Sequence, residues 1–523
     1  MSEPHPAITT PARRGLRWWP AVLILVGTLV AVAVIRLRDD LPFQQRNINT
    51  AQTSFVAFAL LLLWWTLLSR APKRLRLGMT AGVLALIVLV VALFRIRGVS
   101  GDLVPILEPR WAKRVLPAPQ SNASPASAFQ GFNNSMQTDF PQSLGPDRTG
   151  VLPGPKLATD WSSSPPKILW RQKIGGAWSG FSIAGGRAFT QEQRGEDECV
   201  TCYELATGRL LWSHADKTRY ATTIAGEGPR ATPTVVGGRL FTLGATGFLN
   251  CLDAATGKGV WSRNLATDAH AKIPEWGLVG SPLLVDDRVI VSAGGSANKS
   301  LLAYRADDGQ FAWSGGSGEA NYGSPFVATL AGVRQILVFN TLVITSHDAA
   351  TGAVLWEHRW TSANPSAAVP VVVDGTRVVF SSGYGFGSDL LEIRRKPNGK
   401  LAATRVWHST RMKSKFAHIF ARDGFLYGLD DGIFACVDLK DGSLRWKEGR
   451  YGHGQGLLVG ELYLLMAESG ELVLLRPTPD APQELARFRV FNAKTWNPIA
   501  LSGDLLLVRN DQEAACLRLP LAK

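Results

Sequence analysis

Cysteine is scarce in this chain of 523 residues, which holds only five. An odd number gives no complete disulfide framework, and the Cys199-Val-Thr-Cys202 pair lacks the context of a known motif. A c-type haem would need histidine next, where Tyr203 stands. A thioredoxin-like pair would begin a helix, whereas this pair lies in a strand pattern, in which positions i and i+3 face opposite sides. We therefore expect the cysteines to be small apolar side chains of strands.

A basic surface of the kind that binds nucleic acid is also missing, although the formal net charge is +14. Residues 1–114 hold 15 Lys and Arg against 5 Asp and Glu, and the remaining residues hold 41 against 37. The excess is thus confined to the N-terminal region, and no basic stripe follows it. We expect no nucleic-acid partner.

Charged residues are absent from three N-terminal stretches, Trp18–Ile35, Asn47–Ser69 and Leu77–Phe94. Each is long enough to cross the ~30 Å hydrocarbon core of a bilayer as a helix. A cleaved signal peptide would explain the first stretch but not the other two. The sequence therefore predicts a membrane domain over residues 1–97, with transmembrane helices at about 18–36, 51–69 and 77–95, embedded in a lipid bilayer.

Basic residues flank these stretches unevenly. The groups expected on the cytoplasmic side are Arg13, Arg14 and Arg17, and Arg70, Lys73, Arg74 and Arg76. The opposing segments also carry arginines, at Arg36, Arg38, Arg46, Arg95 and Arg97, which weakens the bias. By the positive-inside rule, the N-terminus is cytoplasmic and everything after about residue 98 lies outside. We expect a bacterial inner-membrane protein with a periplasmic, extracytoplasmic C-terminal region.

Residues 98–165 lack periodicity. Segments such as Asn122-Ala-Ser-Pro and Gly131-Phe-Asn-Asn-Ser are rich in turn formers. This composition is typical of a flexible linker.

Aromatic residues recur 39 to 52 residues apart along the rest of the chain. These markers are Trp170, Trp212, Trp261, Trp313, Trp356, Trp407, Trp446 and Phe488. Glycine stands four residues before tryptophan in the clear copies, which are Gly208/Trp212, Gly257/Trp261, Gly309/Trp313, Gly352/Trp356 and Gly442/Trp446. A period of about 40 to 50 residues, with strand patterns inside it, is typical of β-propeller blades.

Each repeat contains the signals of four short strands. The turn Asp253-Ala-Ala-Thr-Gly257 lets its glycine take a positive φ, and Ser281-Pro282 introduces the next apolar strand. The first unit lacks its own beginning, and Glu513–Leu519 supplies the missing strand without a tryptophan. We expect the two ends to complete one blade, which closes the ring and removes open sheet edges. Residues 166–523 are thus predicted to form an all-β propeller of eight blades, with seven as the alternative.

The phrase Asp253-x-x-Thr256-Gly257-x-x-x-Trp261 and its copies resemble the tryptophan-docking repeats of the pyrroloquinoline quinone (PQQ) propeller superfamily. The resemblance covers about two thirds of the chain and carries no substrate contact. It implies two functional branches. Quinoprotein dehydrogenases hold PQQ and Ca²⁺ on the propeller axis and oxidise alcohols or sugars. Non-catalytic propellers include the scaffold lipoprotein of the outer-membrane β-barrel assembly machinery.

Three departures favour the scaffold branch over an enzyme. There is no adjacent Cys-Cys pair, no haem attachment site, and no interval between markers above 52 residues that would hold long blade insertions. We therefore expect a membrane-anchored binding or scaffolding module, with a protein partner or a small ligand at the propeller face. The alternative is a PQQ- and Ca²⁺-dependent dehydrogenase that reduces membrane quinone, and a third interpretation is a ligand-sensing propeller with a vestigial cofactor site.

Candidate ligand-binding residues lie where the chain leads into the innermost strand of each blade, because these loops open on the mouth of the central channel. The set is Trp178, Arg230, Trp276, Asn321, Tyr322, His418, His453, Gln455, Trp496 and Asn497. Aromatic rings and arginine suit a planar anion such as PQQ. The competing interpretation is that these side chains only fill the channel.

No catalytic or metal site can be assembled from the sequence. A quinoprotein needs a carboxylate base and oxygen ligands for Ca²⁺, and Glu227, Glu275, Asn321 and Asn497 are the nearest donors to the channel mouth. They form no recognisable motif, so no cofactor is assigned. Lys413-Ser-Lys415 is interpreted as a solvated loop.

Overall fold

The computed structural model describes residues 15–38, 41–112 and 139–522. The chain divides into two compact units, Met1–Lys113 and Arg114–Lys523. Each is described by itself.

The first unit contains three helices that are long and apolar enough to cross a membrane, as predicted. They are α1 (Trp19–Leu37), α2 (Phe43–Leu63), which continues into the π-helical turn η1 (Trp64–Leu68), and α3 (Lys73–Leu93). Helix α2 begins ahead of the expected position 51, directly after Pro42, because proline is tolerated at a helix start and not inside one. A two-stranded hairpin, β1 (Phe94–Val99) and β2 (Pro105–Pro109), follows α3 without an intervening loop.

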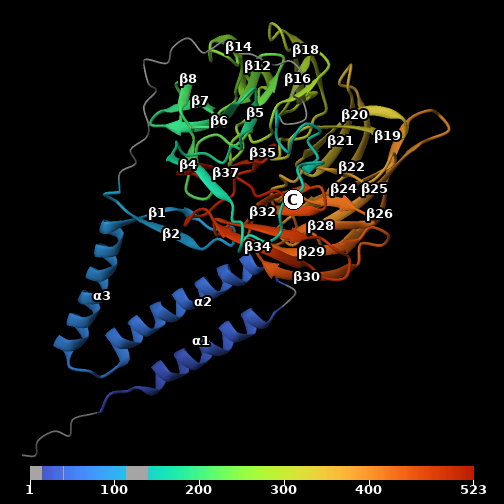
Figure 1. Cartoon of the computed structure of the whole chain (residues 1–523). Coiled ribbons are helices and arrows are strands. Elements are labelled where there is room, and N and C mark those ends of the chain that lie inside the picture. Colours follow the sequence, from blue (N-terminus) through green and yellow to red (C-terminus); the bar gives the residue numbers. More distant parts are fainter. Residues whose placement is uncertain (1–14, 39–40, 113–138, 523) are drawn as a thin grey trace, which may run out of the picture. The chain divides into compact units, whose positions relative to one another are not determined.

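The second unit is a propeller of eight sheets, which confirms the predicted blade number (Figure 1). Blades 1 to 4 consist of β5 (Ser182–Ala184), β6 (Arg187–Arg194), β7 (Asp197–Glu204) and β8 (Leu210–Asp216); β11 (Thr234–Val236), β12 (Arg239–Leu243), β13 (Phe248–Asp253) and β14 (Gly259–Asn264); β15 (Leu283–Val285), β16 (Arg288–Gly295), β17 (Lys299–Arg305) and β18 (Phe311–Gly315); and β19 (Phe326–Leu330), β20 (Val333–Asn340), β21 (Val343–Asp348) and β22 (Val354–Arg359).

Blades 5 to 8 follow in the same antiparallel order. They consist of β23 (Val371–Val372), β24 (Arg377–Ser382), β25 (Gly387–Arg395) and β26 (Leu401–Ser409); β27 (Phe420–Arg422), β28 (Phe425–Asp430), β29 (Ile433–Asp438) and β30 (Leu444–Arg450); β31 (Gln455–Val459), β32 (Leu462–Met466), β33 (Glu471–Arg476) and β34 (Gln483–Arg489); and β35 (Ala500–Ser502), β36 (Leu505–Arg509), β37 (Glu513–Arg518) and β4 (Lys167–Lys173). The loops between blades also hold β9 (Ala221–Thr222), β10 (Gly226–Glu227) and α4 (Leu265–Ala269).

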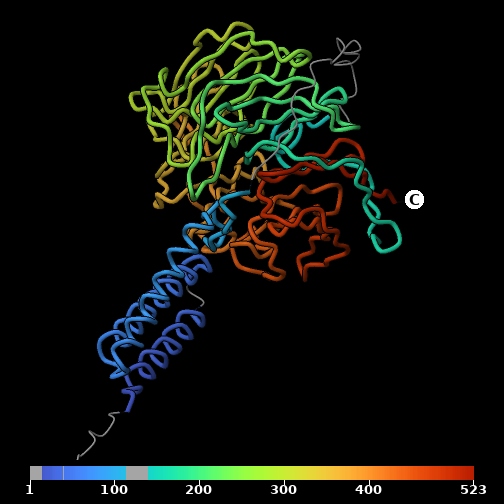
Figure 2. The backbone as a smooth tube through the Cα atoms, turned by 90° about the vertical axis from the view of Figure 1, so that its left-hand side faces the viewer, coloured from blue at the N-terminus to red at the C-terminus, as the bar shows by residue number. Residues whose placement is uncertain are grey.

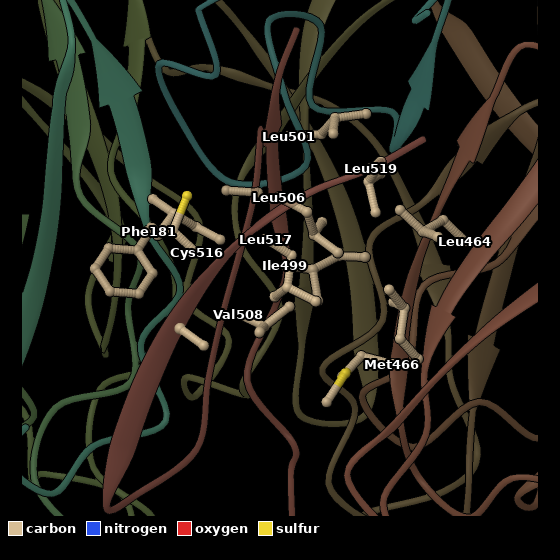
Figure 3. Close-up of a cluster of buried hydrophobic side chains, with 14 of the residues drawn as sticks. Phe181, Leu464, Met466, Ile499, Leu501, Leu506, Val508, Cys516, Leu517 and Leu519 are labelled. Carbon is tan, nitrogen blue, oxygen red and sulfur yellow. The ribbon is translucent and has the colours of Figure 1, made fainter. Parts of the chain in front are cut away.

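Blade 8 is shared by the two ends of the propeller, as predicted. Strand β4 pairs antiparallel with β37, and segments from both ends of the propeller lie side by side (Figures 1 and 2). In this pairing Trp170 lies opposite Cys516. Buried side chains from blades 7, 8 and 1 meet beside this closure, among them Met466, Ile499 and Phe181 (Figure 3). All five cysteines are buried and free, in agreement with the expectation.

The repeat motif forms the seams between blades. Trp212 of blade 1 lies against Gly257 of blade 2, where an added Cβ would come within 2.5 Å of the indole ring. The indole Nε1 donates to the carbonyl of Ala254 at 3.3 Å. The same contact between an indole ring and a glycine joins Trp170 to Gly208, Trp261 to Gly309, Trp313 to Gly352, and Trp407 to Gly442. Trp356 differs, because the next repeat is degenerate: its Nε1 donates to Gln335 of its own blade.

The Ser/Thr-Pro signals have a structural role that the sequence did not indicate. Each hydroxyl accepts a hydrogen bond from the backbone of the preceding blade: Gly180 N donates to Thr232 Oγ1, Thr232 N to Ser281 Oγ, and Ser281 N to Ser324 Oγ, at 2.9 to 3.1 Å. These bonds connect the starts of the first four blades around the axis.

Residues 139–152, within the range interpreted as a linker, thread the centre of the propeller. Phe140 exchanges backbone hydrogen bonds with Ile183 of β5, and the carbonyl of Pro141 accepts from Val235 of β11. Strand β3 (Val151–Leu152) then adds in parallel to β31 (Gln455–Val459), the innermost strand of blade 7. The innermost strand of a blade is an edge strand with unpaired backbone groups. This segment supplies hydrogen-bond partners for some of these groups in blades 1, 2 and 7.

Candidate ligand-binding collar

The loops that lead into the innermost strands carry a closed set of aromatic and cationic side chains at one end of the propeller. We name this set the collar. Its members are Trp178, Tyr220, Arg230, Trp276, Tyr322, Tyr384, Lys415, Phe416, His453, Lys494 and Trp496. All eight blades contribute. Tyr384 comes from the β24–β25 turn, which lies at the same end of the strands because neighbouring strands are antiparallel.

Ring contacts run along one half of the collar. Trp276 stacks on Tyr322 with centroids 5.0 Å apart and lies 6.5 Å from Tyr384. Lys415 Nζ lies 5.2 Å from the Tyr384 ring and 3.3 Å from Nε2 of His453. These contacts connect blades 3 to 7 side chain by side chain.

The other half closes the circuit. Phe416 lies 5.8 Å from His453 and 5.2 Å from Trp496, whose ring is 4.9 Å from that of Trp178. The Nε1 of Trp178 donates to the carbonyl of Ala225, which also accepts from Nη2 of Arg230, both at 2.7 Å. The Tyr220 side chain, over which Arg230 lies, donates its hydroxyl hydrogen to the carbonyl of Glu275, the residue before Trp276. The collar is therefore continuous around the axis, although its members are far apart in sequence.

Three cations of the collar lie over aromatic rings. Arg230 covers the Tyr220 ring at 4.6 Å, and Lys494 lies 4.6 Å and 3.8 Å from the rings of Trp178 and Trp496; Lys415 lies over Tyr384. Burial lowers the pKa of Arg230 to about 10, which still leaves it charged at neutral pH. Cations held against ring faces in partly desolvated surroundings provide both stacking surface and positive charge for a ligand.

Two polar atoms, which belong to consecutive residues at the collar, have no hydrogen-bond partner. They are the indole Nε1 of Trp496 and the Oδ1 of Asn497, both buried. The amide of Asn497 is fixed, because its Nδ2 donates to the carbonyls of Ala177 and Ser179 at 3.0 and 2.8 Å. A buried donor and a buried acceptor without partners each carry a desolvation cost, which a bound molecule could relieve.

Glu198, at the start of β7, is a buried carboxyl group next to the collar that the sequence did not suggest. Burial raises its pKa to about 7; Asp216 adds to the rise and the nearby Arg230 counteracts it. Its Oε1 has no hydrogen-bond partner. Only the tertiary structure brings the β6–β7 turn beside the loop of Arg230, so no local signal could have found this residue.

Six of the predicted candidates are collar members: Trp178, Arg230, Trp276, Tyr322, His453 and Trp496. The other four lie elsewhere or bond to backbone. Asn321 accepts from the amides of Tyr322 and Ser366, Gln455 donates to the carbonyl of Phe416, and Asn497 is held as described. His418 is fully enclosed against Gly150 of the central segment, and burial lowers its pKa to about 4.

Sequence reasoning did not select Tyr220, Tyr384 and Lys494. Lys494 stands two residues before Trp496 in the sequence, so a wider window on each loop would have included it. Tyr384 lies in a turn between strands, where no channel-facing position was expected. Lys415 was interpreted as part of a solvated loop and is instead buried, with Nζ 3.7 Å from Oδ1 of Asp431.

Arg148 of the central segment lies in the channel as a buried cation. Its Nη1 and Nη2 donate to the carbonyls of Pro282 and Ser281 at 2.9 and 3.0 Å, and Nη1 also to Gln142 at 3.1 Å. Burial lowers its pKa to about 10. Its bonds tie the segment to the start of blade 3.

The oxygen donors near the collar do not fit a Ca²⁺ site. Ca²⁺ takes about six to eight oxygen ligands. Glu227 is paired with Arg219 at 3.1 Å, and the side-chain oxygen of Asn321 accepts two backbone amides. Within the described ranges, no group of three or more His, Cys, Asp or Glu could hold a metal ion.

A second buried charge cluster lies at the seam between blades 8 and 1. Glu192 accepts hydrogen bonds from Thr201, Tyr203, Gly175 N and Arg194 at 2.5 to 2.9 Å. Burial alone would raise the pKa of Glu192, but Arg194 and Arg509 outweigh it and lower the pKa.

Arg509 of blade 8 completes this cluster. It donates to Thr190 Oγ1 and to the carbonyls of Gln191 and Gly175, at 2.6 to 3.0 Å. Every charge in this cluster is satisfied within the protein, so the cluster is a structural fastening of the ring.

Comparison with known proteins agrees with this architecture. The family model described as outer membrane protein assembly factor BamB matches residues 196–448. No curated protein matches the chain.

Solved structures show the same fold at low sequence identity. The quinohemoprotein alcohol dehydrogenase from Comamonas testosteroni has a TM-score of 0.56 at 12% identity, covering 74% of this chain and 81% of that one. The quinohemoprotein alcohol dehydrogenase ADHIIG from Pseudomonas putida HK5 has a TM-score of 0.53 at 13% identity, over 78% and 83%. BamB from Moraxella catarrhalis has a TM-score of 0.49 at 15% identity, over 68% and 98%. The chain therefore matches the assembly-factor family model over residues 196–448 and shares the propeller fold of the two quinohemoprotein alcohol dehydrogenases.

Proposed function

We propose that this protein is a membrane-anchored propeller that binds a partner at the collar without catalysing its conversion. The partner presents a planar or aromatic group together with an acidic group. In this proposal the apolar helices α1, α2 and α3 anchor the protein in a bacterial inner membrane. The basic residues between α2 and α3 favour an orientation with the propeller outside the cytoplasm.

The collar is the observation that carries the proposal. Its aromatic rings offer stacking faces, and Arg230, Lys415 and Lys494 lie over those rings. The unpartnered Trp496 Nε1 and Asn497 Oδ1 provide one donor and one acceptor beside them. Ring faces, cations and polar atoms at one end of the channel suit a ligand that is both planar and acidic, so this arrangement favours binding over filling.

Among the residues that the structure describes, the carboxylates and amides near the collar form no oxygen cage with a base beside it, which supports a non-catalytic role over a dehydrogenase. Glu198 is the one carboxyl group near the collar with a pKa close to neutrality. General-base catalysis favours such a pKa, yet the group is enclosed behind the collar, only 3% exposed. A proton acceptor must come within hydrogen-bonding distance of its substrate.

The test is a titration of the full-length protein in detergent micelles with PQQ, with and without Ca²⁺, followed by tryptophan fluorescence. A dye-linked oxidation assay on alcohols and aldose sugars runs on the same sample. Saturable quenching without turnover supports the proposal. Turnover would replace it with the dehydrogenase interpretation. No quenching would remove planar anions of this kind as partners, and capture of an inner-membrane or periplasmic protein by the collar would then be tested directly.

A matched pair of variants assigns any binding to the collar. Lys494→Met removes a cation that lies over two collar rings. Lys440→Met removes an exposed cation from the turn after β29, at the opposite end of the strands. We expect the first substitution to weaken binding by about tenfold, because a partly exposed cation that would face the acidic group of the ligand is lost, and the second to leave binding unchanged.

A further inference from the structure

The hairpin β1–β2 has one apolar face and one polar face. The strands pair antiparallel with Phe94 opposite Pro109, Arg95 opposite Glu108 and Ile96 opposite Leu107. Because side chains alternate between the faces of a strand, the first and third pairs share one face. Arg95 and Glu108 occupy the other, joined by an ion pair at 2.7 Å.

The apolar face is exposed within its own unit. Ile96 is 52% and Leu107 58% exposed, and Trp111, just past β2, is 64% exposed with its ring 6.3 Å from that of Phe94. An isolated two-stranded hairpin is only marginally stable in water. An uncovered apolar face on such a small sheet requires a partner surface.

The chain fixes this face beside the end of α3. Strand β1 begins at Phe94, directly after the last residue of the helix, Leu93. Arg110, directly after β2, holds the end of this strand against the end of α3. Its backbone amide donates to the carbonyl of Leu93 at 2.9 Å, and its Nε donates to the carbonyl of Val91 at 3.1 Å. Trp111 follows at once, next to the end of the apolar helix, and aromatic side chains gather at membrane interfaces.

The same end of the unit is polar elsewhere. Asn47 near the start of α2 donates to the carbonyl of Asp102 in the hairpin turn at 3.0 Å and accepts from Arg36 at the end of α1 at 2.8 Å. These bonds bring together the hairpin turn, the end of α1 and the start of α2. The hairpin therefore lies at the boundary between the apolar and polar parts of this unit.

We propose that the β1–β2 hairpin is a membrane-interface element whose Phe94–Ile96–Leu107–Trp111 face lies on the lipid bilayer, with the Arg95–Glu108 pair turned to water. This inference rests on the membrane anchoring of the proposed function. Burial of apolar side chains at the boundary of headgroups and acyl chains is the same force that holds amphipathic helices there. The hairpin thereby fixes how the chain leaves α3.

Site-specific fluorescence in vesicles tests the proposal on the full-length protein. All five native cysteines are buried, so a single introduced cysteine can be labelled with an environment-sensitive dye. Leu107→Cys reports the apolar face, Arg95→Cys the polar face, and Val88→Cys, 67% exposed near the end of α3, the membrane span itself. Quenchers are a lipid carrying a nitroxide close to its headgroup and aqueous iodide.

The expected result is lipid-nitroxide quenching several-fold stronger at position 107 than at position 95, with the reverse order for iodide. Equal iodide quenching at both positions would overturn the proposal, because the apolar face would then be in water. Protection of position 107 from both quenchers would also overturn it, since protein would then cover the face. Ile96→Cys repeats the measurement on the paired strand if Leu107→Cys fails to fold.

The label at position 88 separates this inference from the anchoring on which it rests. Lipid-nitroxide quenching at 88 without quenching at 107 would reject the hairpin proposal alone. Loss of lipid-nitroxide quenching at 88 would reject the membrane span, and the hairpin proposal with it.

Discussion

The seam between blades 8 and 1 and the collar hold buried charges in opposite ways. At the seam, Glu192 and Arg509 use their polar atoms on partners within the protein, and both side chains are fully buried. At the collar, Trp496 Nε1, Asn497 Oδ1 and the Oε1 of the neighbouring Glu198 lack partners. A satisfied buried network rigidifies a fold, whereas unsatisfied polar atoms carry a cost that the fold does not recover by itself. This difference in hydrogen bonding distinguishes the structural charge cluster at the seam from the collar, where polar atoms remain available to a ligand.

Removing the central acid of the seam gives the largest expected effect. Glu192→Ala deletes the acceptor of four hydrogen bonds and removes the carboxylate that lowers the electrostatic cost of burying Arg509 and of half-burying Arg194. Breaking a buried pair in this way costs about 3–5 kcal/mol. This loss of stability is measured by comparing the unfolding midpoints of the full-length wild type and Glu192→Ala, followed by tryptophan fluorescence.

Glu204→Ala is the matched control, on the neighbouring strand β7 of the same blade. Glu204 meets Arg209 at 3.5 Å, with 36% and 46% of the side chains exposed, and such surface pairs contribute about 0–1 kcal/mol. Similar shifts for both variants would mean that the seam network stabilises no more than a surface pair.

The contribution of Glu198, the carboxyl group next to the collar, to the stability of the protein should depend on pH. The folded pKa of Glu198 is raised from 4.5 to about 7, so between these values the unfolded chain releases the proton and the folded protein retains it. Stability is therefore lost as pH rises through this window and stays reduced above it. We expect Glu198→Gln to stabilise the protein by about 3 kcal/mol at pH 8 and by nearly nothing at about pH 4.5.

Unfolding midpoints of the wild type and Glu198→Gln at the two pH values provide this test. A difference between the two proteins that does not change with pH would contradict the raised pKa. It would also remove the contrast with Glu192, whose pKa is lowered.

The other seams rely on shape instead of charge. Gly257→Ala places a Cβ within 2.5 Å of the Trp212 ring at a φ of +72°. Gly399→Ala meets nothing within 4 Å at a φ of +81°, so it controls for backbone strain alone. We expect Gly257→Ala to destabilise the protein by about 2 kcal/mol more than Gly399→Ala, the cost of overpacking. Equal midpoints would show that the tryptophan contact does not hold the seam.

The smallest effect on stability is expected in the collar. Lys494→Met removes a partly exposed cation–ring contact, which is worth about 0.5–1 kcal/mol. A thermal midpoint close to that of the wild type, together with weakened PQQ quenching, would sharpen the contrast with the seam. A midpoint shift as large as that of Glu192→Ala would show that the collar is itself a fastening.

The fold could be predicted from the sequence because the patterns that indicate it lie within short stretches of the chain. A glycine with positive φ, such as Gly257, is four residues from Trp261, and the strand of Glu513–Leu519 matches the missing start of the first unit. These features identified eight blades and the shared closing blade before any contact was known. The apolar lengths of the three helices were likewise readable from composition.

Only some of the collar residues could be predicted from the sequence. Trp178, Arg230, Trp276, Tyr322, His453 and Trp496 lie in loops whose place in the repeat could be counted. Tyr384 comes from a turn of another kind, and His418, at a counted position, is enclosed against Gly150. Counting positions gives the end of the propeller at which a side chain lies but not its depth.

The sequence by itself determined the blade number, the closure of the ring and the apolar helices, because each follows from periodicity, turn chemistry or composition within one short stretch. Only the tertiary structure decided that residues 139–152 thread the centre, that Glu198 lies by Arg230, and that the collar is continuous. Turn formers without periodicity look like a linker until the innermost strands offer them hydrogen bonds. The pKa of a carboxyl group and the neighbours of a ring depend on residues far apart in the chain, which no local pattern encodes.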